Sequence, residues 1–328
     1  MHRFLCLAGV VLAIPFHAVA LVDANSAANT NAPPDGAPWI NVGTISGASG
    51  IYLGDAWVLT ANHVGPGSIN LNGTTYPYSG TFQQLTNANG SGADMLVFRL
   101  ASKPNLPSLP LVATTPAAST PVDMIGYGYI AGSSETTIGV YTGFYWAPHG
   151  RKGWGNNRVA AGGLQDVNAG GGTVTAFVTD FTAPGPMQAS HEAQAAPGDS
   201  GGGVFVNQSG TWHLAGMMFG IDNLPLQPAN TSVYGDLTYS ANIATYGNQI
   251  LSLIGRAAPL RLTISPVGAD VMVCWPDTAA GYTLESTANL TPAPAWTTVA
   301  QNLSSTNGQG CIRLPATGGP RFFRLISP

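Results

Sequence analysis

The chain has 328 residues, and only 8% of them are charged, against roughly 25% in an average soluble protein. With 45% hydrophobic residues and a formal net charge of −4, the composition excludes a disordered chain. It indicates a β-rich, turn-rich protein of about two or three domains. The chain carries no basic stripe, so we expect no nucleic-acid partner.

Residues 1–20 are predicted to be a signal peptide. His2 and Arg3 give a polar start, Phe4–Phe16 is apolar, and Ala18-Val19-Ala20 fits a small-x-small cleavage site. The apolar run is shorter than the roughly 20 residues that cross a bilayer, and a membrane anchor is the alternative. We therefore expect a secreted protein, extracellular or periplasmic, with no membrane span.

Residues 21–38 are rich in Ala, Asn and Pro and show no periodic pattern, so they are expected to be a leader, a linker or a short pro-segment. From Trp39 the pattern changes to short apolar runs, which predict the strands Ile40–Ile45, Gly50–Leu53 and Ala56–Thr60. The last of these runs into His63. A histidine in that place is usually structural, so His63 needs partners from elsewhere in the chain.

A hairpin is predicted at Ile69–Tyr78, with Asn72-Gly73 as its turn. Asp94 then stands at the head of the apolar strand Gly92–Leu100. Most aspartates in such a position cap a turn, and a functional role again depends on partners. The uncharged, Pro-rich stretch that follows Lys103 predicts a linker between two β units.

The densest cluster of special residues is Pro197–Gly203, where Ser200 lies among four glycines and beside Asp199. Glycines allow positive φ angles and close approach to another molecule, so this serine can be exposed among backbone N–H groups. On this stretch alone, a plain turn and a nucleophile are both open.

The second β unit begins with a strand over Pro121–Tyr129. After it, apolar runs predict strands at Gly172–Asp180, Gly203–Asn207 and Trp212–Phe219. Over Ser240–Gly255 apolar residues recur every three to four positions, which predicts an amphipathic helix that packs on one face.

A separate module is predicted from Pro259 to Pro328, because six short strands in a stretch of this length indicate a small β-sandwich. Without the signal peptide, the chain keeps two cysteines, Cys274 and Cys311. An even pair in an exported chain predicts one disulfide, and two free buried thiols are the alternative. The predicted domains are thus 1–20, 21–38, 39–258 and 259–328.

Acyl transfer by serine needs a base, a carboxylate that orients the base, and donors for the oxyanion, but no metal or cofactor. The α/β-hydrolase order is Ser, acid, His. Only His213 follows Ser200, and it follows too closely for an intervening acid and parallel strands, so this fold is excluded. The subtilisin order puts the acid first and needs an α/β fold. In a nearly all-β chain, the order His63, Asp94, Ser200 leaves a double-barrel arrangement.

The segments Trp57–Val64 and Gly198–Gly202 resemble those of the trypsin/chymotrypsin family of serine proteases. The resemblance covers Trp39 to about Gly255. It implies an all-β fold of two six-stranded antiparallel β-barrels with a C-terminal helix. It also implies a secreted endopeptidase that hydrolyses protein or peptide substrates through an acyl-enzyme.

The resemblance implies a role for each matching residue. Ser200 is the nucleophile, and His63 is the general base and then the acid for the leaving amine. Asp94 orients His63 and stabilises its cationic form. The backbone N–H groups of Gly198 and Ser200 form the oxyanion hole.

The same resemblance places Gln194, six residues before the nucleophile, at the base of the primary specificity pocket, with Met218-Phe219-Gly220 along its wall. Because Gln194 is neutral, a tryptic preference for Lys or Arg is not expected, and a neutral or apolar side chain is. His191 and His213 leave open a preference for acidic side chains.

In many members of the family a new N-terminal amine pairs with the carboxylate at the position of Asp199. A mature chain that starts after Ala20 does not match the family's Ile-Val-Gly-Gly start. Arg151, Lys152 and Arg158 are the alternative partners, and the sequence selects none of them.

The last module resembles immunoglobulin- or fibronectin-like β-sandwiches appended to secreted bacterial proteins, through Trp275, Gly281–Ser286, Trp296 and Arg321–Leu325. It is expected to bind a surface or a partner, or to act as a spacer. A catalytically silent, protease-like adhesion or binding protein is therefore the alternative function.

Overall fold

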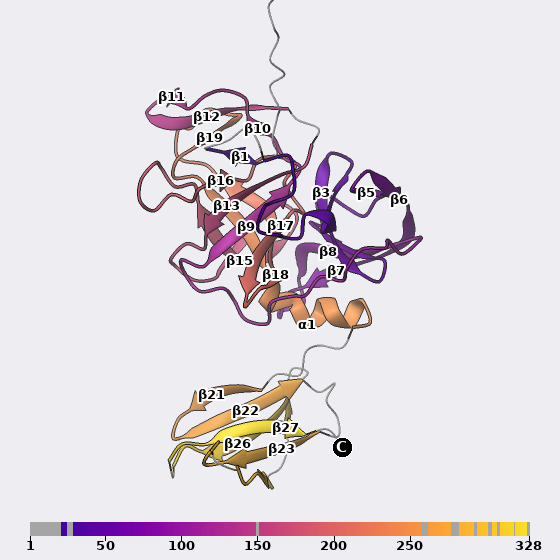
Figure 1. Cartoon of the computed structure of the whole chain (residues 1–328), viewed down its shortest axis with the longest axis vertical. Helices are drawn as coiled ribbons and strands as arrows, with labels where there is room; N and C mark the ends of the chain where they lie inside the picture. The colour runs from indigo at the N-terminus through magenta and orange to yellow at the C-terminus, as the bar shows by residue number, and fades with distance from the viewer. Residues whose placement is uncertain are drawn as a thin grey trace, which may run out of the picture. The chain divides into compact units, whose positions relative to one another are not determined.

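The computed structural model describes residues 21–24, 29–148, 151–256, 262–276, 282–291, 294–300, 304–306, 309–317 and 319–326. The predicted signal peptide and the predicted module start at Pro259 lie outside the described residues. The chain divides into two compact units, Met1–Ile254 and Gly255–Pro328, which are described separately (Figure 1).

The first half of unit 1 is a seven-stranded antiparallel sheet, drawn in indigo and purple in Figure 1. Its order is β6-β5-β2-β3-β4-β8-β7, and a 3-10 turn, η1 (Trp39–Asn41), precedes it. One apolar cluster that includes Tyr52 and Phe98 forms its core. The strands are β2 (Val42–Ile45), β3 (Ala48–Gly54), β4 (Trp57–Thr60), β5 (Ile69–Leu71), β6 (Thr74–Tyr76), β7 (Tyr78–Thr86) and β8 (Gly92–Leu100).

The second half of unit 1 is another seven-stranded antiparallel sheet, with the order β13-β9-β17-β18-β20-β15-β14. Buried side chains such as Phe177 and Phe205 fill its interior. The strands are β9 (Pro121–Gly126), β13 (Gly153–Arg158), β14 (Gln165–Asn168), β15 (Thr173–Asp180), β17 (Gly203–Gln208), β18 (Thr211–Asp222) and β20 (Leu237–Asn242).

The all-β architecture predicted from the sequence is confirmed, but each sheet has seven strands where the sequence predicts six. The strands β6 and β14 end their sheets, each as one arm of a short hairpin; the sequence predicts the hairpin of β6 but not β14. The turn Asn72-Gly73, with φ angles of 49° and 87°, folds β6 back on β5. Its glycine suits the left-handed conformation that such a turn requires.

Two small sheets in unit 1 are not predicted by the sequence. One joins β10 (Ile130–Ala131), β11 (Thr136–Ile138), β12 (Tyr141–Ala147) and β19 (Thr231–Val233). The other pairs β1 (Val22–Asp23) with β16 (Ala193–Gln194). Part of the segment 21–38, to which the sequence assigns no element, is therefore a strand of the folded unit.

The predicted helix is present as α1 (Ile243–Leu253). It begins three residues after Ser240 because β20 extends to Asn242. Its buried face includes Ile243, Tyr246 and Ile250, as the apolar period predicts. No helix among the described residues is long and apolar enough to cross a membrane.

Unit 2 consists of two antiparallel sheets that share one hydrophobic core, a sandwich arrangement. Trp275 and Ile312 from one sheet and Leu284 from the other lie in this core. The first sheet has β21 (Thr263–Val267), β22 (Asp270–Pro276), β26 (Gln309–Pro315) and β25 (Ser304–Thr306), in that order. The second has β24 (Thr297–Thr298), β23 (Thr283–Thr287) and β27 (Phe322–Ile326).

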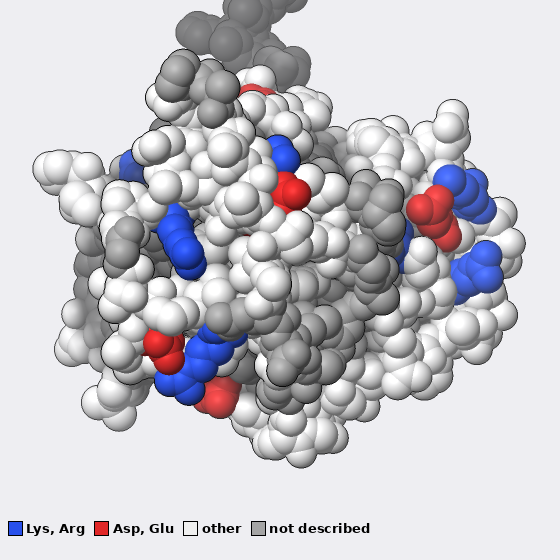
Figure 2. Space-filling model, turned by 90° about the horizontal axis from the view of Figure 1, so that it is seen from below, with Lys and Arg blue, Asp and Glu red and all other residues white. Residues whose placement is uncertain are grey.

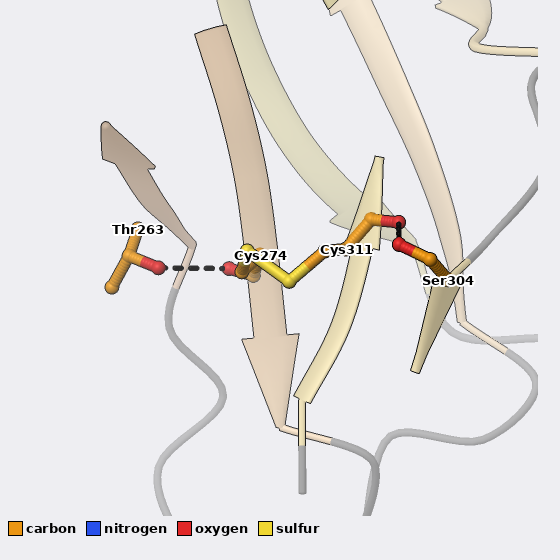
Figure 3. The surroundings of a disulfide bond; sticks show 4 residues. All are labelled: Thr263, Cys274, Ser304 and Cys311. Carbon is orange, nitrogen blue, oxygen red and sulfur yellow. Dashed lines mark hydrogen bonds between the residues drawn. A yellow bond between two sulfur atoms is a disulfide. The ribbon is translucent and has the colours of Figure 1, made fainter. Parts of the chain in front are cut away.

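The predicted disulfide between Cys274 and Cys311 is confirmed (Figure 3). The two cysteines face each other on the neighbouring strands β22 and β26. Thr263 and Ser304, from the strands on either side, donate hydrogen bonds to the carbonyl groups of the two cysteines. The disulfide therefore links the central strands of one sheet.

Charged side chains are few and scattered on the face shown in Figure 2. Most of that surface carries no formal charge, in keeping with the low charged fraction of 8%. The Lys103–Asp55 ion pair of unit 1 is exposed to solvent, where such a pair contributes little to stability. The fold of unit 1 therefore depends on apolar burial and backbone pairing rather than on surface ion pairs.

Candidate active site

Asp94 and His63 form a close pair in the first sheet. Because β4 pairs with β8, the loop that follows Thr60 lies beside the start of β8. The Asp94 carboxylate is fully buried, and its Oδ2 lies 2.6 Å from His63 Nδ1. Its Oδ1 accepts a hydrogen bond from the His63 backbone N–H at 2.9 Å. The carboxylate thus fixes both the backbone and the ring of His63.

A glycine of the second sheet covers the Asp94 carboxylate. Gly171, in the turn between β14 and β15, lies so close that a Cβ atom on it would overlap both carboxylate oxygens. Gly172 approaches the backbone of Gly92 and Ala93 in the same way. The sequence analysis missed this contact, although the run Gly170-Gly171-Gly172 was a visible signal for a close approach.

The Ser200 loop docks on the first sheet, close to the strand that precedes His63. The Ser49 N–H donates to the Ser200 carbonyl at 2.9 Å. Thr60 Oγ1 donates to the Ser49 carbonyl at 2.7 Å. Gly201, with a φ of 82°, packs so tightly on Ser49 and Thr60 that a Cβ atom would overlap them. Only glycine fits both this backbone conformation and this space.

Two backbone donors of the loop have no partner among the described residues. The N–H groups of Asp199, Gly201 and Gly202 donate to the carbonyls of Ala196, Met218 and Asp199, respectively. No hydrogen bond among the described residues uses the N–H groups of Gly198 and Ser200. Gly198 has a φ of 99°. These two amides are therefore available for a developing oxyanion.

Ser200 and His63 are both accessible. Ser200 is half-buried, and the His63 side chain is 35% exposed. Among the described residues, no hydrogen bond joins Ser200 Oγ to the His63 ring, and none uses His63 Nε2. Catalytic hydrogen bonds are often long before substrate binds. With Nδ1 held by Asp94, Nε2 is the nitrogen free to accept a proton.

Asp199 is buried and is held by backbone amides. Its carboxylate accepts hydrogen bonds from the N–H groups of Gly128 at 2.7 Å and Ala196 at 2.9 Å. No ion pair of the described residues includes it. Burial raises its pKa to about 7, and the two amides oppose that shift.

Of the cations considered for Asp199, Lys152 and Arg158 have other partners. Lys152 Nζ donates to the carbonyls of Trp39 and Val42, and Arg158 donates to the Ser119 carbonyl.

The segment that starts at Leu21 is buried beside the strand that leads to the Asp199–Ser200 loop. Leu21 and Val22 are both 0% exposed. Val22 pairs with Gln194, and Leu21 forms a bridge with Ile130. Asp23 accepts a hydrogen bond from Asn29 at 2.7 Å. Leu21–Asp23 is thus part of the second half of unit 1, next to the strand that leads to Asp199.

The residues predicted for the specificity pocket are tightly packed. Gln194 is fully buried, and its amide donates to the Leu237 carbonyl and accepts from Thr238 Oγ1. Met218 and Phe219 are 1% and 2% exposed. Because Gln194 is fully buried and both ends of its amide contact the protein, this side chain is not exposed to substrate in this structure.

The two histidines considered near this pocket have other contacts. His191 packs on Trp154 with ring centroids 4.7 Å apart, and its Nδ1 lies 3.2 Å from Asn29 Nδ2. His213 Nδ1 contacts the Thr211 carbonyl at an exposed site on β18. Neither contact involves a residue predicted for the specificity pocket.

Comparisons with known proteins show which chains this one is similar to. The family model described as Trypsin matches residues 27–244. Mouse neuropsin, a serine protease expressed in the limbic system, is 16% identical with a TM-score of 0.45, over 69% of this chain and 99% of that one. Human heparin binding protein is 16% identical with a TM-score of 0.44, over 73% of this chain and 99% of that one. The chain has no match among curated proteins.

Proposed function

The chain belongs to the trypsin family, whose model matches more than half of it, and from that premise we propose that it is a secreted serine endopeptidase. One observation carries the proposal. A buried carboxylate holds a histidine 2.6 Å away, and a glycine-rich loop docked on Thr60, three residues before that histidine, carries Ser200 with two backbone donors that no described residue uses. Acyl transfer by serine requires these parts in one place.

In the proposed reaction, His63 Nε2 takes the proton of Ser200 Oγ while Oγ attacks the scissile carbonyl carbon. The N–H groups of Gly198 and Ser200 stabilise the oxyanion of the tetrahedral intermediate. His63 then gives its proton to the leaving amine, and an acyl-enzyme remains on Ser200. Water hydrolyses the acyl-enzyme with the same base. Asp94 keeps the His63 ring in the required tautomer throughout.

For substrate preference, we propose neutral or apolar side chains at the primary pocket. The Gln194 amide is neutral, buried and bonded to Leu237 and Thr238, and Met218 and Phe219 are apolar. A lysine or arginine side chain would find no carboxylate among these residues. Cleavage of a peptide library should therefore show no enrichment of Lys or Arg before the scissile bond.

Peptide hydrolysis by matched variants tests the proposed activity. Ser200→Ala should abolish peptide cleavage, because it removes the nucleophile. Ser190→Ala, at an exposed serine nearby in the sequence, should keep the parent rate. If the parent protein cleaves no peptide but binds cell-wall glycan or a protein partner through its C-terminal module, the alternative of a silent, protease-like binding protein is favoured.

We propose further that removal of residues 1–20 during secretion also matures the enzyme. A chain that begins at Leu21 places its new α-amino group in a fully buried position, beside the strand that leads to Asp199. By the family resemblance, this amine is the partner of the Asp199 carboxylate. Leu21-Val22 then acts as the new N-terminus that Ile-Val-Gly-Gly provides in the family, although the two sequences do not match.

The N-terminal residue of the active protein tests this maturation. Protein that starts at Leu21 should be much more active than protein with two extra residues before Leu21, because the extension removes the charged amine from the buried position. N-terminal sequencing of the secreted protein should give Leu-Val-Asp-Ala. Equal kcat/KM for the extended and mature proteins would argue against a role for the amine.

A further inference from the structure

The side chain of Ser49, on β3 of the first sheet, reaches the loop that carries Ser200. Its Oγ donates to the Gly198 carbonyl at 2.9 Å and accepts from the Tyr127 backbone N–H at 3.0 Å. The two roles of this hydroxyl are fixed, because a carbonyl can only accept and an N–H can only donate. Ser49 is fully buried, so solvent does not compete for these two bonds.

Ser49 contacts both residues of the proposed oxyanion hole. Its hydroxyl holds the Gly198 carbonyl, and its backbone N–H donates to the Ser200 carbonyl at 2.9 Å. The bond to Ser200 uses only the main chain, so any residue at position 49 except proline can make it. The bond to Gly198 requires the serine hydroxyl, and a substitution can therefore remove it alone.

Each of the two unused donors lies in a peptide plane whose carbonyl is hydrogen-bonded. The Pro197 carbonyl accepts from the Tyr129 N–H at 3.0 Å, and the Asp199 carbonyl accepts from the Gly202 N–H at 2.7 Å. The C=O and N–H groups of a planar trans peptide point in opposite directions. These bonds therefore direct both donors away from the groups that hold the carbonyls.

One further peptide plane, between Gly198 and Asp199, separates the two donors. Its N–H donates to the Ala196 carbonyl at 3.0 Å, and its carbonyl accepts from Ser49 Oγ. This plane shares a Cα atom with each neighbouring plane, so its rotation would turn one donor relative to the other. Gly198, with a φ of 99°, has no side chain to oppose such a rotation. The Ser49 hydroxyl therefore helps to fix the angle between the two donors.

The same hydroxyl joins the two halves of unit 1 at this loop. Tyr127 directly follows β9 of the second sheet, whereas Ser49 belongs to the first. Gly198 is packed between both halves, because a Cβ atom on it would lie 3.1 Å from the Gly47 carbonyl oxygen and 3.0 Å from Gly128 Cα. The proposed oxyanion hole is thus assembled where the two halves meet.

We propose that Ser49 is a positioning residue of the oxyanion hole, whose hydroxyl holds the Gly198–Asp199 peptide so that both donors point at one oxyanion. This inference rests on the proposed protease function. The oxyanion exists only in the transition states and the tetrahedral intermediate, so loss of the hydroxyl should lower kcat and leave substrate binding unchanged. A hydroxyl that serves only the fold would not produce this separation.

Steady-state kinetics of Ser49→Ala on a peptide substrate test the role of the hydroxyl. The variant should lower kcat by roughly 100-fold, the scale of a lost or misplaced oxyanion donor, and keep KM within about threefold. A peptide aldehyde gives a second measurement, because Ser200 Oγ adds to its carbonyl carbon and the carbonyl oxygen then lies in the oxyanion hole. Its affinity should fall by about the same factor as kcat.

Thr44→Ala is the matched control. Thr44 lies opposite Ser49 on β2, and its hydroxyl also donates to a backbone carbonyl, that of Ala48, at 3.1 Å. This variant should keep the kcat, KM and aldehyde affinity of the parent. Ser49→Thr retains the hydroxyl and should restore most of kcat. If Ser49→Ala does not fold, Ser49→Cys replaces it, since a thiol fills the same space but is a weak donor.

The outcomes separate the role of Ser49 from the proposed function. Equal kcat in Ser49→Ala and Thr44→Ala would overturn the role of Ser49 and leave the protease function standing. A loss that appears only in KM, with no change in aldehyde affinity, would also overturn it. A folded parent that neither hydrolyses peptides nor binds the aldehyde would instead contradict the protease function, and the role of Ser49 with it.

Discussion

At the scale of single residues, Asp94 owes its position to groups from both halves of unit 1. His63 donates to it from the first sheet, and Gly171 closes over it from the second. The carboxylate is therefore shielded from water and has a fixed orientation. Shielding strengthens its interaction with the imidazolium that forms during the proposed reaction.

Asp94→Asn should lower kcat/KM by roughly 10⁴-fold, because an amide cannot hold the His63 tautomer that leaves Nε2 free to accept a proton. Asp166→Asn is a suitable control at an exposed aspartate. Steady-state kinetics on a peptide substrate measure the effect. A loss of less than tenfold would show that Asp94 is not the orienting acid.

Gly171→Ala should lower kcat/KM by about 100-fold, the scale expected when a catalytic group moves by about 1 Å. The added Cβ would overlap the Asp94 carboxylate and displace it. Gly185→Ala is the control, since its Cβ would meet only the Ala183 carbonyl at 3.9 Å. If both variants keep the parent rate with unchanged thermal midpoints, Gly171 has no part in positioning Asp94.

At the scale of elements, Lys152 connects β13 to η1 and β2. Its Nζ donates to the carbonyls of Trp39 and Val42, and it lies 4.3 Å from the centre of the Trp39 ring. Burial lowers its pKa from 10.5 to about 7. The link between the two sheets thus contains a group that titrates near neutral pH.

The sign of the resulting pH dependence follows from proton counts. Between pH of about 7 and 10.5 the unfolded chain binds more protons at Lys152 than the folded chain does, so the free energy of unfolding rises with pH across this window. Lys152→Met should remove that rise. Urea unfolding of both chains in the Ser200→Ala background, at about pH 7 and about pH 9, measures it. The same rise in both chains would contradict the assignment to Lys152.

The disulfide is the corresponding link within unit 2. Cys274 and Cys311 are 37 residues apart, and closing a loop of that length stabilises a fold by roughly 4 kcal/mol in the chain-entropy model. The double change Cys274→Ala, Cys311→Ala should therefore lower the free energy of unfolding of unit 2, measured by calorimetry, by about this amount. It should leave peptide cleavage intact. A large loss of kcat/KM would instead show that unit 2 supports the protease unit.

A strand or helix was predictable from the sequence where a single local pattern of residues determines it. The apolar period gives α1, the apolar runs give β4 and β8, and Asn72-Gly73 gives a hairpin. The strand β1 was not predictable, because Val22-Asp23 is too short to show a period and is buried through contacts with segments far along the chain. The site divides in the same way: motifs identify His63 and Ser200, but the Gly171–Asp94 contact exists only in three dimensions.

At the scale of the whole molecule, the chain combines a trypsin-family unit with a small two-sheet module. The described part of the first unit has no disulfide, and its charged side chains are few. Apolar cores and the buried Lys152 link then hold it together. The second unit has its own disulfide and its own core. Proteolytic activity is expected to depend on the first unit alone.

The central claim is that Ser200 is an activated nucleophile, and site-mapped labelling with a fluorophosphonate probe tests it most directly. The mature protein should gain one adduct, located by mass spectrometry on the peptide that contains Ser200. The adduct should be absent from Ser200→Ala, from Asp94→Asn at short times, and from urea-unfolded protein. Labelling that persists in Ser200→Ala, or native protein that never reacts while its fold is intact, would contradict the assignment.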